Sequence, residues 1–373
     1  MLRAYIINFF HSLGGNSIRT IFPAYLSEFT PDAFLISIVN SAYVIARLLA
    51  FLLSGISDAI GERKSVLISS VALASLFLCY IVADSLLALF LISALIGVFS
   101  TIFYAGLSIV LSRSKQRGIA FTSMESFFQI GFVVGSITGG LVADYYSMKF
   151  VFLIAAITAI ITAFIATGFK RNYQKKAPVI HNLRESVSSH LKIYICSGAF
   201  TGILNGIIYL TIPLLILTLG YSKFHIGVVI AFSSVVTAVL IPTFGKLSES
   251  KGQKTILVFA TVLGIFASIL LVFYHSLMFI IILAPVLVLA RNANLNIGRA
   301  WLINEINKRP ATHLGINDSF FSAGTIIGGI TAGAIIEFSG YSMVFLFMFA
   351  VLVIQAILFM FYAKNNKLYY DVR

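Results

Sequence analysis

Long apolar runs recur along the whole chain, and they limit the folds that it can adopt. Each has about 20 residues or more, the length that spans the ~30 Å hydrocarbon core of a bilayer. Within lipid such a segment must be a helix, because a helix satisfies its backbone polar groups internally. The sequence therefore predicts an all-α membrane protein with twelve transmembrane helices. The runs are Ala4–Phe29, Phe34–Ile56, Ser65–Ala83, Leu86–Leu111, Ile119–Val142, Met148–Gly168, Ile193–Leu219, Ile226–Leu247, Thr255–Tyr274, Leu277–Leu302, Leu314–Ile336 and Met343–Ala363.

The composition excludes a soluble protein. Of the 373 residues, 59% are hydrophobic and 10% are charged, whereas a soluble domain carries about 25% charged residues. The first run follows Arg3, as the apolar part of a secretory signal would follow its basic start. It is too long for such a signal and leads into a second span without an obvious cleavage site. We therefore expect it to be the first helix.

The net charge of +13 would suit a nucleic-acid partner, but the placement of the cations argues against one. Lysine and arginine gather in alternate loops, which is the positive-inside pattern of membrane proteins. This pattern predicts a multi-pass protein of the cell membrane with both termini and the segment Lys170–Lys192 in the cytoplasm. The loop cations are Arg63, Lys64, Arg113, Lys115, Arg117, Lys170, Arg171, Lys175, Lys176, Arg184, Lys246, Lys251, Lys254, Lys308, Arg309, Lys364, Lys367 and Arg373.

The sequence offers no sign of catalysis. Cys79 and Cys196 belong to different spans and are interpreted as free thiols. The sequence contains no metal-ligand spacing and no nucleotide-binding loop. We therefore predict that the protein is not an enzyme, needs no cofactor or metal, and draws any energy for transport from a gradient.

The chain repeats itself after its middle. The stretch "SFFQIGFVVGSITGG" from Ser126 matches "SFFSAGTIIGGITAG" from Ser319, and Pro23 matches Pro213 as a site of helix bending. The sequence thus predicts a six-helix bundle over residues 1–169, a cytoplasmic linker over 170–192, and a second bundle with a short tail over 193–373. Parallel repeats of this kind mark secondary transporters, in which two bundles rock about a central site.

Two loops occupy matching places in these repeats. "SGISDAIGERK" follows the second span and "GKLSESKGQK" follows the eighth. Both resemble the signature loop of the major facilitator superfamily, Gly-x-Leu-x-Asp-x-x-Gly-Arg-Lys. The first copy departs from it at Ser54, Ile56 and Glu62, and the second has Glu249 in place of aspartate. The resemblance covers essentially the entire chain.

The resemblance implies the fold of that family and transport by alternating access. It implies that helices one, four, seven and ten line a cavity, and that helices two, five, eight and eleven form the interface between the halves. It also implies a latch in which an acid faces the positive N-terminus of a helix in the other half. The residues assigned to this latch are Asp58, Gly61, Arg63, Lys64, Glu249, Gly252 and Lys254.

The fifth span carries glycines at four-residue spacing, namely Gly131, Gly135 and Gly139, followed by Gly140. Small residues at this spacing allow helices to approach closely. The run also resembles a motif of antiporters in the same family, but Ser136 stands where that motif has proline. We favour helix packing as the role of these glycines.

Four arginines lie inside predicted spans: Arg19, Arg47, Arg291 and Arg299. A permanently charged arginine near the middle of a bilayer costs roughly 2.5–3.5 kcal/mol on insertion scales, so a function or a partner is expected. We predict that Arg19 and Arg291 contact an anionic substrate, with Arg47 contributing charge. Polar residues in the same spans are candidate neighbours, with ordinary interhelical hydrogen bonding as the alternative: Tyr43, Tyr104, Gln129, Asn205, Asn292 and Asn296.

Acidic residues are absent from the middle of the predicted spans, so we expect an electropositive cavity. Glu125 and Asp318 stand at equivalent positions near the cytoplasmic starts of spans five and eleven, and are candidates for gating ion pairs with the arginines. His11 in the first span could carry a coupled proton, since histidine titrates near neutral pH. A packing role for His11 is the favoured alternative.

These observations predict a secondary active or facilitative transporter of a small organic anion, with proton coupling as an option. One alternative is efflux of lipophilic compounds, and another is a membrane receptor or scaffold that does not transport. The expected partners are a small-molecule substrate and the lipid bilayer, without nucleic acid, and we expect a monomer.

Overall fold

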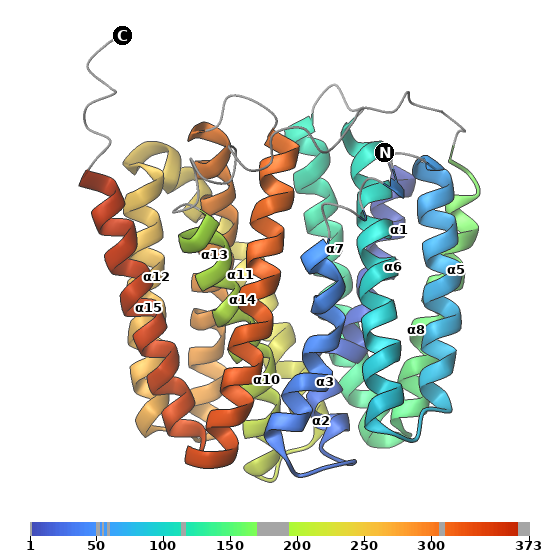
Figure 1. The fold of residues 1–373 in the computed structure, drawn as a ribbon, viewed down its shortest axis with the longest axis horizontal. Coiled ribbons are helices and arrows are strands. Elements are labelled where there is room, and N and C mark those ends of the chain that lie inside the picture. The colour runs from blue at the N-terminus through green and yellow to red at the C-terminus, as the bar shows by residue number, and fades with distance from the viewer. Residues whose placement is uncertain are drawn as a thin grey trace.

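The computed structural model describes residues 2–49, 53, 56–57, 60–112, 117–169, 194–305 and 310–364, and these are arranged in helices (Figure 1). Ten helices in this part of the chain are long and apolar enough to cross a membrane. The helices of the first half are α1 (Leu2–Arg19), α2 (Phe22–Leu26), α3 (Ala33–Ile45), η1 (Ala46–Leu49), α5 (Glu62–Ile81), α6 (Leu86–Ser112), α7 (Arg117–Tyr145) and α8 (Met148–Ala166). Those of the second half are η2 (Tyr194–Ala199), α10 (Phe200–Thr218), α11 (Lys223–Lys251), α12 (Gln253–Phe273), α13 (Leu277–Glu305), α14 (Pro310–Ser339) and α15 (Tyr341–Lys364).

The first predicted span is interrupted. Helix α1 ends at Arg19, and α2 begins at Phe22 with Pro23 in its first turn. A proline ring collides with the carbonyl group four residues before it, here that of Arg19, and proline has no N–H to donate. Between the helices, the hydroxyl of Thr20 forms a 2.9 Å hydrogen bond with that of Ser136 in α7. The matching proline of the second half, Pro213, lies inside α10, which continues to Thr218.

The predicted second span begins as α3 and η1, and of its remainder the structure describes only residues 53 and 56. The predicted seventh span begins as a π-helix, η2, before α10. The predicted linker, residues 170–192, lies outside the described residues, which end at Phe169 and resume at Tyr194.

The helices form two groups that stand side by side (Figure 1). In the first group α1 packs on α7 and α8, and α5 packs on α6 and α8; in the second, α10 packs on α14, and α12 packs on α13 and α15. Between the groups α7 packs along α11, and α3 packs along α14. The predicted fold class, two six-helix bundles each built from one sequence repeat, is confirmed.

Helix α1 begins and α15 ends at the same end of the molecule (Figure 1). We call this the terminal end, and the opposite end the distal end. Helices α5, α7, α12 and α14 run from the terminal to the distal end, and α3, α6, α8, α11, α13 and α15 run back.

Candidate functional site

A cavity of about 1240 Å³ lies between the two groups of helices. Its wall includes residues of α1, α3, α6 and α7 from the first half, and of α10, α11, α13 and α14 from the second. It reaches the terminal end, where Glu249 near the end of α11 and Gln253 at the start of α12 line it. Its volume exceeds the ~300–1,000 Å³ of most small-molecule pockets.

Arg19 lies in this wall as the last residue of α1. Its guanidinium carbon is 5.7 Å from the ring centre of Tyr43 in α3 and 5.1 Å from that of Tyr209 in α10. A cation over an aromatic face gains about 0.5–1 kcal/mol at exposed sites and more when water is excluded. Arg19 is thus held between rings from both halves.

Arg291 of α13 lies on the same tyrosine. Its guanidinium carbon is 5.5 Å from the ring centre of Tyr209, and its Nη2 donates a 3.3 Å hydrogen bond to the Tyr209 hydroxyl. Arg291 is 8% exposed and does not line the cavity, and its buried Nε has no partner within the described residues. Arg291 is thus linked to the cavity through Tyr209, and its direct contact with a substrate stays a prediction.

Tyr209 was not among the residues predicted from the sequence, although two signals point to it. It stands four residues before Pro213, as Arg19 stands four residues before Pro23, so the two are repeat equivalents. It also follows Asn205 by one helical turn, which places both on one face of α10. Both line the cavity.

The other predicted contact residues are divided by the structure. Five line the cavity: Tyr43, Arg47, Tyr104, Asn205 and Asn296. Asn292 does not line it, and its carbonyl accepts a 3.0 Å hydrogen bond from Nδ2 of Asn296. Nδ2 of Asn205 is 3.4 Å from the Thr325 hydroxyl, an interhelical contact between α10 and α14.

His11 also lines the cavity. Its ring stacks on Phe103 with centroids 4.0 Å apart and meets the edge of Tyr104 at 5.1 Å. These contacts are those of a packed aromatic ring.

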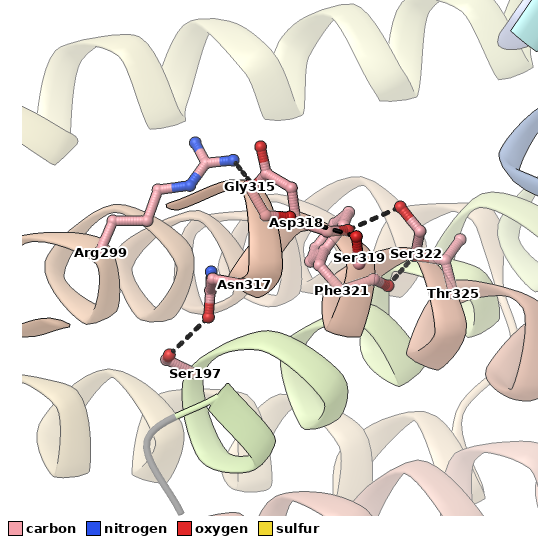
Figure 2. A network of polar contacts seen from close by, with 9 residues as sticks. All are labelled: Ser197, Arg299, Gly315, Asn317, Asp318, Ser319, Phe321, Ser322 and Thr325. Atoms are coloured by element: carbon pink, nitrogen blue, oxygen red, sulfur yellow. Dashed lines mark hydrogen bonds and ion pairs between the residues drawn. The ribbon is translucent and has the colours of Figure 1, made fainter. Parts of the chain in front are cut away.

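The charge of the cavity is mixed in sign, which corrects the expectation that it is electropositive throughout. Three carboxylates line it towards the terminal end, those of Glu125, Glu249 and Asp318. Asp318 accepts a 2.5 Å hydrogen bond from Nη2 of Arg299, and the two side chains form an ion pair (Figure 2). Glu125, at the equivalent position of α7, accepts a 2.8 Å hydrogen bond from Gln129. The described wall therefore holds both signs of charge, since Arg19, Arg47 and Arg299 line it together with these carboxylates.

Asp318 lies in a polar stretch of α14 whose neighbouring side chains are hydrogen-bonded (Figure 2). The hydroxyls of Ser322 and Thr325 donate to carbonyls four residues earlier, so they are satisfied within the helix. Asn317 faces the other way and accepts a 3.1 Å hydrogen bond from Ser197 of η2. The carboxylate of Asp318 is thereby left to face Arg299.

The predicted latch is only partly described. Asp58 lies outside the described residues. Gly61 and Gly252 directly precede α5 and α12 with φ of 83° and 88°, a left-handed conformation that glycine adopts without strain. Arg63 and Lys64 lie in the first turn of α5, and Nζ of Lys254 is 5.5 Å from the ring centre of Trp301. The latch itself stays a prediction.

The glycines of α7 lie at helix contacts. A Cβ atom would come within 2.5 Å of the Phe9 carbonyl oxygen at Gly131, 2.3 Å of that of Leu13 at Gly135, and 2.2 Å of that of Ser17 at Gly139. These three face α1 in the same half. Gly140 faces the other half, where a Cβ atom would lie 2.7 Å from the carbonyl oxygen of Lys223 in α11.

At the distal end, carboxylates of each half bind the first turn of a helix in the other. Asp144 near the end of α7 accepts hydrogen bonds from the backbone N–H groups of Lys223 at 3.0 Å and Phe224 at 2.8 Å. Glu337 near the end of α14 accepts one from Ala33 at 3.0 Å. Asp144 and Glu337 are repeat equivalents. Glu28 also pairs with the side chain of Lys223. The two halves are thus joined at the distal end.

Comparison with known proteins identifies relatives along almost the whole chain. The family model described as Major Facilitator Superfamily matches residues 4–288 and 193–368. Proteins named multidrug resistance protein MdtG, from Salmonella arizonae and Salmonella paratyphi A, are each 24% identical over 319 residues, covering 81% of this chain and 78% of the relative.

Solved structures show the same fold. The nucleoside transporter NupG aligns with a TM-score of 0.78 at 16% identity, over 97% of this chain and 98% of that one. A POT family transporter in complex with a thioalcohol-conjugated peptide aligns with a TM-score of 0.78 at 12% identity, over 97% and 95% of the two chains.

Proposed function

This chain belongs to the Major Facilitator Superfamily, and from that premise we propose that it carries a small organic anion across the cell membrane by alternating access. As a member of that family it is a membrane transporter of small molecules rather than an enzyme. The proposal concerns its substrate class, its site and its orientation.

The observation that carries the proposal is the meeting of Arg19 and Arg291 on the ring of Tyr209. No carboxylate of the described residues forms an ion pair with either arginine. The tyrosine faces offset part of the cost of burying the charges. Arg19 keeps its planar set of N–H donors for a carboxylate or phosphate, which guanidinium binds through two parallel hydrogen bonds.

The same arrangement couples binding of the substrate to movement of the two halves. Arg19 belongs to the first half, whereas Tyr209 and Arg291 belong to the second. An anion on Arg19 competes with the ring of Tyr209 for the guanidinium, so occupancy changes a contact between the halves. Arg291 then acts by holding the Tyr209 hydroxyl in place.

We propose that the terminal end is cytoplasmic. The support is the gathering of cations in the loops at that end, which is the positive-inside pattern. The cavity reaches this end, and the halves are joined at the distal end by Asp144 and Glu337. On this orientation the conformation is inward-facing, and opening of the distal contacts would expose the cavity to the outside.

The test is flux and binding with variants of Arg19. Arg19→Lys keeps the charge but loses the planar donors, so anion uptake into proteoliposomes should fall roughly tenfold or more, because a hydrogen bond to a charged group is worth about 1.5–3 kcal/mol. Arg47→Gln serves as the comparison, since Arg47 lines the cavity and has no aromatic ring over its guanidinium among the described residues, and its effect should be smaller. Binding of organic cations that improves in Arg19→Ala would show that the proposed sign of the substrate is wrong.

Efflux of lipophilic compounds is the second candidate. Aromatic residues line part of the cavity, among them Phe22, Phe77 and Phe128, and relatives are named as multidrug resistance proteins. Competition by anionic against cationic lipophilic solutes in the same flux assay separates the two candidates. Absence of flux for every solute, with the protein correctly folded, would favour the receptor or scaffold alternative.

A further inference from the structure

The cavity does not stop at Arg19. The residues that line it include a buried group of the first half that lies further towards the distal end than Arg19, and we infer that a branch of the cavity runs along this group. This branch, which we call the aromatic branch, is lined by Phe22 of α2, Phe77 and Tyr80 of α5, and Ser93 and Ile96 of α6. Tyr80 lies one residue before the distal end of α5, and Ser93 lies two turns from the distal start of α6.

The second half has no such branch among its described residues. Helix α12 is the repeat equivalent of α5, and each begins directly after a glycine with positive φ, Gly252 and Gly61. From α12 only Gln253, at the terminal end, lines the cavity. The equivalents of Phe77 and Tyr80 are Ser268 and Leu271, which are buried away from it. The branch is therefore a property of one half and not of the fold.

The branch also coincides with the break in the first span. Arg19 ends α1 on one side of the break, and Phe22 begins α2 on the other. The matching helix α10 has no break. Interrupted helices at mid-membrane are where transporters bind substrate, because the interruption brings groups of different character to one place. Here Arg19 and Phe22 flank the interruption, and both line the cavity.

The chemistry of the branch is apolar. The rings of Phe22 and Tyr80 have centroids 5.6 Å apart, and Tyr80 stacks from behind on Phe152 at 4.9 Å. The two hydroxyls in its wall bond each other, Tyr80 Oη to Ser93 Oγ at 2.6 Å. With these groups satisfied, the wall offers ring faces and an aliphatic side chain, which suit an aryl or alkyl group.

We propose that the aromatic branch is a subsite for the apolar ring of the substrate, whose anionic group binds Arg19. The substrate class is then an aryl-bearing organic anion such as an arylalkyl carboxylate, and not a small hydrophilic anion. This inference rests on the proposed function, because it takes the anion on Arg19 as its starting point.

Acetate and phenylacetate are suitable probes, since they share a carboxylate and differ by a ring. Their binding to the purified full-length protein is measured by the concentration that shifts its unfolding temperature. Burying a ring should make phenylacetate bind about tenfold more tightly than acetate or better. Benzyltrimethylammonium, with the ring but the opposite charge, is expected to give no shift.

Filling the branch tests its location. Ile96→Phe should bring the ratio of the two affinities down to about one. The matched control is Leu287→Phe at the equivalent position of α13, which is buried but does not line the cavity, and should keep the ratio of the unaltered protein. If Ile96→Phe does not fold, Phe77→Leu, which removes a ring while keeping an apolar side chain, should lower the ratio.

The outcomes separate the two proposals. Equal affinities for acetate and phenylacetate, or a ratio that survives in folded Ile96→Phe and Phe77→Leu, would overturn the subsite while leaving the anion site intact. No shift with either carboxylate, together with a shift by benzyltrimethylammonium, would overturn the proposed function itself.

Discussion

The first spans of the two halves share a proline at the matching position but differ in helical structure. In α1 and α2, proline at Pro23 coincides with a break, and an arginine stands four residues before it. In α10, Pro213 is accommodated in a continuous helix, and a tyrosine stands four residues before it. Burial does not explain the difference, because both prolines lie among fully buried neighbours. The hydrogen bond of Thr20 to Ser136 holds the interrupted turn from the side, whereas the repeat equivalent of Thr20 in α10 is Leu210, which has no hydroxyl.

At the distal end, by contrast, the two halves are alike. There Asp144 and Glu337 make the same contact in both halves, each with the first turn of the helix that faces it. The repeat is thus retained where the halves must meet and part, and lost where a substrate would be recognised. A symmetric contact lets either half close on the other, but an asymmetric site gives a bound molecule a single orientation.

The largest expected effect comes from the packing of α7 on α1. Gly139→Ala places a methyl group 2.2 Å from the backbone oxygen of Ser17, which cannot move without moving α1. We expect a loss of stability of at least ~1–3 kcal/mol, the cost of overpacking a filled core. The second half has alanine at the equivalent position, Ala332.

The reverse substitution, Ala332→Gly, provides the matched comparison and should cost only about 1 kcal/mol through helix propensity. Thermal unfolding of both variants in the same detergent measures the difference. Equal losses would mean that the two halves pack alike at this point despite their sequences.

The fold followed from the sequence because its main determinants are local. Apolar length specifies each span, and cation placement and the repeat specify how the spans are grouped. The site was harder to predict, because the sequence gives the depth of a residue but not the direction in which its side chain points. Arg291 was at the right depth and yet does not line the cavity, to which it is linked through Tyr209. The sequence predicts a gating role for Glu125 and a latch role for Glu249, and both carboxylates also line the cavity.

The aromatic branch could not have been foreseen for a related reason. Phe77 and Tyr80 look like ordinary lipid-facing or core residues of an apolar span, and their place in the cavity wall emerges only from the packing of α5 in the structure. A proline in the first span predicted a bend. In the structure the interruption is accompanied by the contact of Thr20 with Ser136, two residues that lie far apart in the sequence.

The second largest effect is expected from removing the break between α1 and α2. Pro23→Ala restores an N–H donor and removes the collision with the carbonyl of Arg19, so α1 and α2 should join into one helix. Joining them would turn Arg19 away from its position between Tyr43 and Tyr209. We expect anion transport to fall about tenfold, which corresponds to roughly 1.4 kcal/mol, with little loss of stability. Pro213→Ala is the matched control and should reduce transport less. A larger effect of Pro213→Ala would mean that the continuous helix, and not the broken one, positions the site.

The smallest effect is expected at the distal end, and it should be the same in both halves. Asp144→Ala and Glu337→Ala each remove the carboxylate that binds the first turn of a helix in the other half. Such a contact is worth about 1 kcal/mol, so each variant should raise the population open at the distal end about fivefold. Spin labels at Ser85 and Ser276, equivalent loop positions at the distal ends of the two halves, would report this as a longer distance.

Asp32→Ala is the control for Asp144→Ala and Glu337→Ala. Asp32 accepts hydrogen bonds from Phe34 and Leu35 in its own helix α3, so its loss weakens a helix terminus without removing a contact between the halves. It should leave the distance between the labels as it is, whereas the double variant of Asp144 and Glu337 should shift it by about the sum of the single effects, because the two contacts share no residue. An equal shift in Asp32→Ala would show that helix fraying, and not separation of the halves, opens the distal end. A shift in only one of the two single variants would show that the symmetry of these contacts is geometric and that one of them alone holds the closed state.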